Sequence, residues 1–200
     1  HPRVRRQRQM CIRDRYDGYS TNGTKYFNMN HSSNTNSGGW KGCDLRYDVL
    51  GSTNTNDGDA TATTATNPVA NTLMAALPSD LRAVMQPMTI YTDNTGGGSD
   101  NASYVTKTTD YLPLLAEYEI FGTRTYANSA EKNYQAQYAY YSAGNSKVKY
   151  RHSATGSTAW WWERSPTCDG SNYFCIVYTN GYADYNIARF SYGVAPAFRV

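Results

Sequence analysis

Short apolar clusters alternate with long polar stretches along the whole chain, and their spacing predicts many small elements. Trp40, Leu45, Val49 and Leu50 recur at helical spacing and predict one helical face over residues 41–50. Residues 52–66 consist largely of Thr, Asn, Asp, Gly and Ala, a composition that predicts a loop. Residues 54–59 within it faintly resemble a calcium-binding loop, but the bidentate acid that ends such loops is missing, so a flexible turn is favoured.

Two short helices are predicted next. Asn67-Pro68 begins the first, over 67–77, because a capping Asn followed by Pro is a common helix start. The second covers 79–85, and we expect its Leu81, Val84 and Met85 to face the core.

The rest of the chain contains strand patterns around two further apolar segments. Residues 88–92 and 102–108 alternate and predict two strands around three glycines at 96–98. Segment 112–121 fits a buried helix or a strand-like core segment, and a helix over 130–143, capped by Ser129, would align Tyr134, Tyr138 and Tyr141. Residues 160–163, 173–178 and 195–200 predict strands, with a turn at 180–181. Helices first and strands last, without an internal repeat or a domain-dividing linker, predict one α+β domain.

Residues 5–14 look foreign to this domain. Their sequence, RRQRQMCIRD, matches residue for residue the translated end of a common transposase sequencing adapter. The alternative is a natural basic arm that binds nucleic acid or anionic lipid. We set residues 1–15 aside as adapter-derived, take 16–37 as polar loops of a truncated chain, and expect the domain to span 38–200.

Removing residues 1–15 reverses the sign of the charge. The whole chain has a formal net charge of +3, and its first fifteen residues carry six Arg and one Asp, a net +5. The remainder has 13 basic and 15 acidic residues, a net −2, so no basic patch indicates a nucleic-acid partner. No apolar run approaches the ~18 residues that membrane insertion needs. Abundant Tyr, Thr, Asn, Ser and Gly are typical of adaptable binding surfaces, or of a β-rich extracellular protein whose tyrosines fill strand faces.

Cysteine and histidine indicate neither disulfides nor metal. Outside residues 1–15 three cysteines remain, Cys43, Cys168 and Cys175, and an odd number argues against a full disulfide framework. The three histidines lie too far apart for a zinc motif. We therefore expect no cofactor and no metal site.

The last 34 residues, 167–200, contain no Lys, Glu, Gln, Met or Trp. The other 166 residues contain about 24 of these five types, a frequency that predicts about five of them in 34 residues. These are the amino acids that no pyrimidine-ending codon encodes. An apolar frame nevertheless persists through the stretch: Phe174, Cys175, Val177, Ala183, Ala188, Val194, Ala195, Pro196, Phe198 and Val200. The pattern predicts a fixed scaffold displaying positions written by randomised codons, and therefore a binding surface.

Four motifs carry a family resemblance. In order they are Gly38-Gly39-Trp40, Leu112-Pro113-Leu114-Leu115 with Glu119-Ile120-Phe121-Gly122, Trp161-Trp162-Glu163-Arg164-Ser165-Pro166, and Gly193-Val194-Ala195-Pro196-Ala197-Phe198. Together they resemble an uncharacterised WWxRSP…GVxPAF domain family of phage, prophage and bacterial surface proteins, over nearly everything after about residue 38. Such domains resemble C-type-lectin-fold proteins, which are distantly related to the formylglycine-generating enzyme. Several resemble the variable proteins of diversity-generating retroelements, where mutagenised adenines in an AAY codon yield only pyrimidine-ending codons.

The resemblance implies a C-type-lectin-like (formylglycine-generating-enzyme-like) α+β fold with short helices and a small antiparallel sheet. Trp161 and Trp162 would pack in its core, and Pro196 and Phe198 would close a final strand.

Other positions would have different roles in such a domain. Glu163 and Arg164 either pair with each other or orient a loop, or else they form an ordinary surface pair, and the sequence leaves these alternatives open. The candidate ligand contacts lie between the frame positions: Thr167, Asp169, Ser171, Asn172, Tyr173, Ile176, Tyr178, Tyr182, Asp184, Tyr185, Asn186, Ile187, Arg189, Phe190 and Tyr192. Aromatic and Arg anchors among polar residues are typical of a binding patch.

Three functions compete on this basis. The leading hypothesis is a non-catalytic receptor-binding domain on a phage tail fibre or a bacterial surface, which binds a cell-surface protein or glycan of a host or neighbouring cell. A formylglycine-generating-type enzyme would need a reactive thiolate, but Cys175 lies in an apolar strand and Cys168 lies among the suspected variable positions. The third function is a purely structural virion or adhesin module. The ligand and the oligomeric state, with a homotrimer among the alternatives, stay open.

Overall fold

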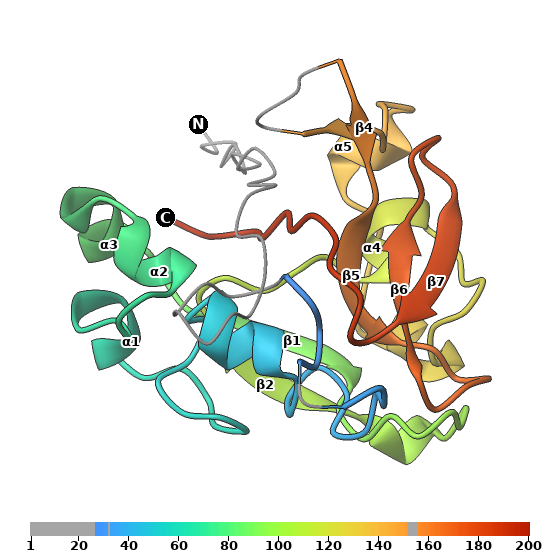
Figure 1. The fold of residues 1–200 in the computed structure, drawn as a ribbon, viewed down its shortest axis with the longest axis horizontal. Coiled ribbons are helices and arrows are strands. Elements are labelled where there is room, and N and C mark those ends of the chain that lie inside the picture. The colour runs from blue at the N-terminus through green and yellow to red at the C-terminus, as the bar shows by residue number, and fades with distance from the viewer. Residues whose placement is uncertain (1–26, 32, 152–155) are drawn as a thin grey trace.

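The computed structural model describes residues 27–31, 33–151 and 156–200 (Figure 1). The predictions for residues 1–15 and for the start of the segment 16–37 lie outside this part of the chain. Its helical elements are η1 (Leu45–Val49), α1 (Thr63–Thr66), α2 (Leu73–Ala76), α3 (Ser79–Val84), η2 (Ala102–Tyr104), α4 (Glu117–Phe121), η3 (Ser129–Asn133) and α5 (Ala139–Ser142). Its strands are β1 (Met88–Asp93), β2 (Val105–Asp110), β3 (Lys149–Tyr150), β4 (Thr158–Ala159), β5 (Trp161–Pro166), β6 (Tyr173–Val177) and β7 (Ala183–Ile187). The expectation of mixed α and β structure with short helices and small antiparallel sheets is confirmed.

The strands form three separate antiparallel sheets. β1 pairs with β2 from Met88 opposite Asp110 to Asp93 opposite Val105, as the alternating pattern predicted. β3 pairs with β4, and β6 lies between β5 and β7. Figure 1 shows the β1–β2 hairpin between the short helices α1–α3 and the three-stranded sheet β5–β7, with α4 beside that sheet. None of the helices in the described residues is long and apolar enough to cross a membrane.

Two helix predictions need correction. The helix expected over 130–143 is wrong, because η3 and α5 are separated by irregular residues. Asn128, and not Ser129, caps η3, since its Oδ1 accepts from the Ala130 N–H at 3.1 Å. Tyr141 is buried while Tyr134 is 55% exposed, so the tyrosines do not share one packed face.

The region before β1 also differs from the prediction. The helix expected to start at Asn67 begins at Leu73, where the Thr72 hydroxyl accepts from the Ala75 N–H at 3.3 Å. The end of the loop expected over 52–66 is helical, as α1. α3 forms as predicted, but Val84 faces solvent instead of the core.

Three strand predictions differ from the structure, because strand formation depends on pairing with segments that are distant in sequence. Residues 195–200 form no strand, although the Ala197 N–H donates to the Pro113 carbonyl at 2.8 Å and the Gln86 N–H to the Arg199 carbonyl at 2.8 Å. The polar segment Ala183–Ile187 is strand β7, which the sequence analysis did not predict. β2 starts at Val105, because the preceding three residues form η2.

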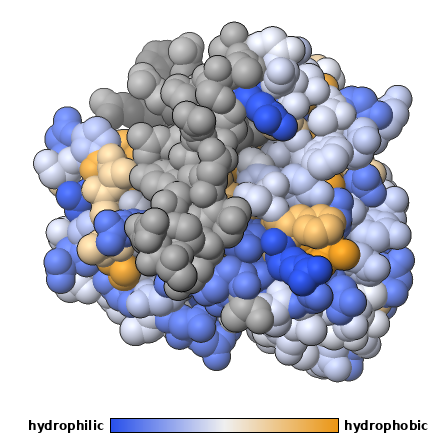
Figure 2. Space-filling view, in the orientation of Figure 1, coloured by the Kyte–Doolittle hydropathy of each residue, from blue (hydrophilic) through white to orange (hydrophobic). Residues whose placement is uncertain are grey.

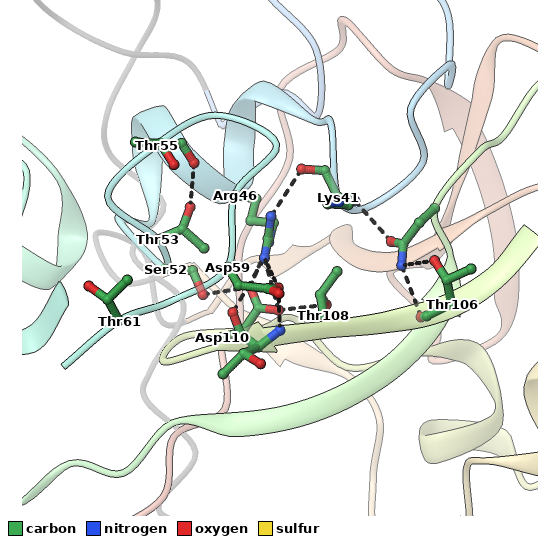
Figure 3. Close-up of polar contacts among 12 residues, drawn as sticks. Lys41, Arg46, Ser52, Thr53, Thr55, Asp59, Thr61, Thr106, Thr108 and Asp110 are labelled. Atoms are coloured by element: carbon green, nitrogen blue, oxygen red, sulfur yellow. Dashed lines mark hydrogen bonds and ion pairs between the residues drawn. The ribbon is translucent and has the colours of Figure 1, made fainter.

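A buried ion pair fastens η1 to the hairpin (Figure 3). The Arg46 Nε donates to Asp110 Oδ1 at 2.7 Å, and both side chains are buried. The Ser52 and Thr108 hydroxyls donate to the same carboxylate at 2.9 and 2.8 Å. A buried charge is tolerated when partners of this kind replace its water, so the network fixes the position of η1 on β2.

The sheet β5–β7 is covered on both faces over two of its three strands. Trp162, Phe174 and Ile176 pack in the larger core, which also contains Trp40 and the residues of η1 and α2. Trp161 and Val177 pack on the other face in a smaller core with Leu115, Ile120 and Tyr141. β7 therefore lies at the edge of a sheet whose other strands are fully packed.

Candidate ligand-binding surface

The family motifs assemble into one scaffold around β5. The Trp162 N–H donates to the Gly193 carbonyl at 2.9 Å, and the Arg164 N–H donates to the Leu115 carbonyl at 2.9 Å. Gly39 lies against the hairpin with a φ of +52°, where a Cβ would stand 2.1 Å from the Asp93 carbonyl oxygen. Only glycine fits at this position. The two hydrogen bonds of β5 join three of the four motifs, which lie far apart in sequence.

The apolar frame of residues 167–200 is the buried part of this stretch. Every frame position except Ala183 and Val200 is buried. Phe174, Cys175 and Val177 lie in β6, while Val194 and Phe198 lie in the segment that follows β7. The frame residues thus form the buried side of β6 and of the segment that follows β7.

The positions between the frame residues lie mostly at the surface. Tyr178, Tyr182, Tyr185, Arg189 and Phe190 are exposed along or beside β6 and β7. The half-exposed candidates nearby are Tyr173, Asp184, Asn186, Ile187 and Tyr192, and Asp169, Ser171 and Asn172 are exposed on the loop before β6. We call these thirteen residues together the β6–β7 surface. In Figure 2 a hydrophobic patch bordered by hydrophilic residues lies over the region of this sheet.

Two candidates do not belong to this surface. Thr167 and Ile176 are each 1% exposed, so a ligand cannot reach either side chain in this structure. The Thr167 hydroxyl instead donates to the Gly170 carbonyl at 3.0 Å, and Ile176 packs in the larger core. Their contact role is corrected to a structural one.

The loop before β6 is held by one asparagine. The Asn36 Nδ2 donates to the carbonyls of Gly170 and Tyr173, both at 2.9 Å. The Asn36 N–H donates to the Ser171 carbonyl at 2.8 Å. The loop that carries Asp169 and Asn172 is therefore fixed by the scaffold, which lowers the entropy that its ordering would cost on binding.

An aromatic cluster forms one side of the β6–β7 surface. The Trp160 ring lies 5.4 Å from that of Tyr178 and 4.9 Å from that of Tyr192, and Phe190 meets Tyr192 edge to face at 6.5 Å. Burial raises the pKa of Tyr192 to about 12, with smaller contributions from Asp184 and Tyr178. Tyr192 is thus a neutral, half-buried support under the more exposed rings.

A second group lies on the other face of β7. The Tyr185 ring lies 4.8 Å from that of Tyr126 and 5.0 Å from that of Tyr173. Tyr126 and Trp160 were missed by the sequence analysis because both precede residue 167. Trp160 adjoins the Trp161-Trp162 motif, which is a usable signal, whereas nothing in the sequence marks Tyr126.

Side chains of the edge strand β7 accept hydrogen bonds from some of the strand's own backbone N–H groups. Asp184 Oδ1 accepts from the Tyr185 N–H at 2.8 Å, and Asn186 Oδ1 accepts from the Ile187 N–H at 2.9 Å. Such local bonds compete with pairing to another strand. These local bonds disfavour the addition of a further strand at this edge.

Comparison with known proteins assigns the family. A family model described as "Domain of unknown function (DUF6273)" matches residues 22–200. The chain belongs to this family. No curated protein and no solved structure matches it. The match includes all four motifs and the whole β6–β7 surface of this DUF6273 domain.

The WWxRSP motif of the DUF6273 domain contains a buried ion pair, but not the expected one. Arg164 donates from Nη1 and Nη2 to the Glu119 carboxylate at 2.6 and 2.8 Å, and from Nη1 to the Leu114 carbonyl at 2.8 Å. The expectations of a mutual Glu163–Arg164 pair and of a surface pair are wrong, because Arg164 pairs with Glu119 and both Glu163 and Arg164 are buried. Arg164 is 1% exposed and ties β5 to α4.

Glu163 is buried without a hydrogen bond to either carboxylate oxygen in the described part of the chain. Burial raises the pKa of Glu163 well above its usual value, and the nearby Glu117 and Glu131 act in the same direction. Glu117 differs, because its carboxylate accepts from the N–H groups of Tyr126 and Ala127. Glu163 is therefore protonated in the folded domain at pH values where it is ionised in the unfolded chain.

The cysteines of the described residues form no disulfide. Cys43, Cys168 and Cys175 are free and buried. Burial raises the pKa of the Cys43 thiol to about 12 and that of the Cys175 thiol well above its usual value. Across the described residues, no group of three His, Cys, Asp or Glu side chains is placed to hold a metal ion, the 54–59 loop included.

We expect Glu163→Gln to stabilise the domain at pH 8 and to leave its stability nearly unchanged at pH 4. The pKa of Glu163 is raised in the folded state. Glu163 therefore costs no stability at pH values below its unfolded-state pKa, and the wild-type protein becomes less stable as the pH rises toward its folded-state pKa. At pH 8 the gain in free energy of unfolding should be about 1.4 kcal/mol for each unit by which the folded-state pKa of Glu163, up to pH 8, exceeds its unfolded-state pKa. Urea denaturation of both proteins at the two pH values measures it.

Glu119→Gln is the matched control, since it weakens a satisfied ion pair and should destabilise the domain at pH 8. An equal effect of Glu163→Gln at pH 4 and pH 8, or a loss at pH 8, would contradict the assignment of Glu163 as a neutral buried acid.

Proposed function

We propose that this DUF6273 domain is a non-catalytic ligand-binding module, whose β6–β7 surface is diversified on a fixed scaffold. The ligand is a protein or glycan on the surface of a host or neighbouring cell. The domain would be displayed at a phage tail-fibre tip or on a bacterial surface. Homotrimeric display at a fibre tip is compatible with this function, as is a monomeric surface domain.

One observation carries the proposal: residue type and burial divide residues 167–200 in the same way. The frame positions are buried, with Ala183 and Val200 as exceptions, and the candidate positions are at the surface, with Thr167 and Ile176 as exceptions. The whole stretch lacks the five residue types that pyrimidine-ending codons cannot encode. A stable core under a surface rich in Tyr, Asn, Ser and Asp is what a tolerant binding scaffold needs.

A C-type-lectin-like fold belongs to the same proposal. Short helices, small antiparallel sheets and a C-terminal strand region that carries the display surface are compatible with it. The resemblance in the four motifs supports this assignment.

An enzyme of the formylglycine-generating type is the weaker alternative. Its chemistry would need an accessible thiolate. Cys175 is fully buried with a raised pKa, and Cys168 is buried beside Arg124, with its pKa also raised. A purely structural module leaves the exposed rings of Tyr182 and Phe190 without a role.

The gene locus provides the test of diversification. We expect a near-copy of the region that encodes residues 167–200, differing from it only at adenines, beside a reverse-transcriptase gene. The differences should fall at codons of the β6–β7 surface and spare codons of buried residues such as Phe174 and Val177. A locus without a near-copy and without the reverse transcriptase would contradict diversification and leave a static binding domain.

A further inference from the structure

A separate cavity, open to solvent, lies between β1 and the layer formed by α4 and β5. Its volume is about 210 Å³. The first four residues of β1 form one wall, and Glu119 of α4 and Arg164 of β5 also line it, with Tyr134, Tyr138 and Arg199 completing the lining. None of these residues belongs to the β6–β7 surface.

Two of the lining residues form a flat aromatic pair. The rings of Tyr91 and Tyr134 are stacked, with centroids 4.3 Å apart and planes 8° from parallel. Met88 and Ile90 add apolar atoms from the same strand. Aromatic side chains in a lining favour contact with another ring.

The charges of the lining favour an anion. Glu119 neutralises Arg164 through two hydrogen bonds, at 2.6 and 2.8 Å. Arg199 has no ion-pair partner among the described residues, and its backbone is fixed by the hydrogen bond from Gln86. In addition, the buried Arg164 Nε lacks an acceptor in the described part of the chain. The lining therefore carries one uncompensated positive charge, and Arg binds carboxylates through its planar guanidinium.

The cavity is large enough for a ring. A cavity of about 150 Å³ holds one benzene molecule, so about 210 Å³ has room for a six-membered ring. We propose that this cavity binds a six-membered-ring compound that carries one carboxylate. Such a compound is either an aromatic acid or a sugar acid, and the two share the carboxylate that Arg199 would bind.

Titration calorimetry on the purified chain separates the two sources. Benzoate represents the aromatic acids and glucuronate the sugar acids, with benzyl alcohol and glucose as their neutral counterparts. We expect one of the two acids to bind with a Kd of about 1 mM or tighter, and its neutral counterpart to bind at least about tenfold more weakly, since the charge-assisted bond is lost.

Arg199→Gln should weaken binding of the preferred acid about tenfold or more, and Tyr134→Ala should weaken it as well. The matched control is Arg151→Gln, which removes an exposed arginine that belongs to neither site and should leave binding of the acid unchanged. The proposal is overturned if neither acid binds below about 10 mM, if the neutral counterparts bind equally well, or if Arg151→Gln has the effect expected of Arg199→Gln. Because the two sites share no residue, failure here leaves the proposed function untouched.

Discussion

Arg164→Met should lower the free energy of unfolding by about 3–5 kcal/mol, the usual cost of leaving one partner of a buried ion pair uncompensated. Glu119 would lose both guanidinium hydrogen bonds in a site that is 8% exposed. The Leu114 carbonyl would lose a donor as well. Since domains are stable by only about 5–15 kcal/mol, this single change would remove a large share of the total.

The double variant Arg164→Met with Glu119→Leu should recover much of this loss. Replacing both partners by apolar side chains of similar size also removes the unpaired carboxyl group of Glu119, and such replacements are often neutral in stability. Urea denaturation of the wild type, both single variants and the double variant gives the coupling energy of the pair.

Arg124→Met is the matched control for this series. Arg124 and Asp100 form a 2.6 Å pair, but their side chains are 31% and 37% exposed. Exposed pairs contribute about 0–1 kcal/mol, so this variant should be nearly neutral. A loss below about 1 kcal/mol for Arg164→Met would show that the WWxRSP arginine does not fasten β5 to α4.

Elements with strong local signals were predictable from the sequence. The β1–β2 hairpin follows from alternation on both sides of three glycines, all of which have positive φ values. β6 follows from its unbroken apolar run, and α3 from its start directly after Pro78. In each case the information lies within a few neighbouring residues.

Elements defined by distant partners were not predictable. β7 is polar and was missed, because its assignment depends on pairing with β6 and not on its own pattern. The segment 130–143 has tyrosines at helical spacing. The side-chain amides of Gln135 and Gln137, however, donate to the backbone carbonyls of Tyr91 and Ile120. These tertiary bonds override local propensity.

The exposure of the candidate residues was predictable from the sequence at most positions. The rule that candidates lie between apolar frame positions placed thirteen of fifteen residues at the surface. It failed at Thr167 and Ile176, whose burial is set by the turn to Gly170 and by contact with the larger core. The partner of Arg164 lies 45 residues away, a separation that no motif spacing reveals.

Replacing Tyr182 and Phe190 together by alanine should abolish binding to the domain's target while leaving the fold intact. Tyr182 is 71% exposed and Phe190 is 41% exposed, so little packing is lost. Aromatic anchors at a binding surface typically contribute 2 kcal/mol or more each, and about 1.4 kcal/mol is a tenfold change in Kd. The expected loss is therefore at least about 100-fold.

The target has to be selected first, from arrays of bacterial surface proteins and glycans, as the ligand that the wild-type domain binds with saturation. The matched control is the double variant Val84→Ala with Tyr140→Ala, which removes exposed apolar area from α3 and α5. Thermal denaturation should give melting temperatures for both double variants close to that of the wild type.

The most direct test of the displayed surface is the Kd of these three proteins for that one target, measured side by side by surface plasmon resonance. We predict an unchanged Kd for the α3 and α5 control and a Kd raised at least about 100-fold for Tyr182→Ala with Phe190→Ala. Equal Kd values for all three folded proteins would contradict the claim that the β6–β7 surface is where this domain binds.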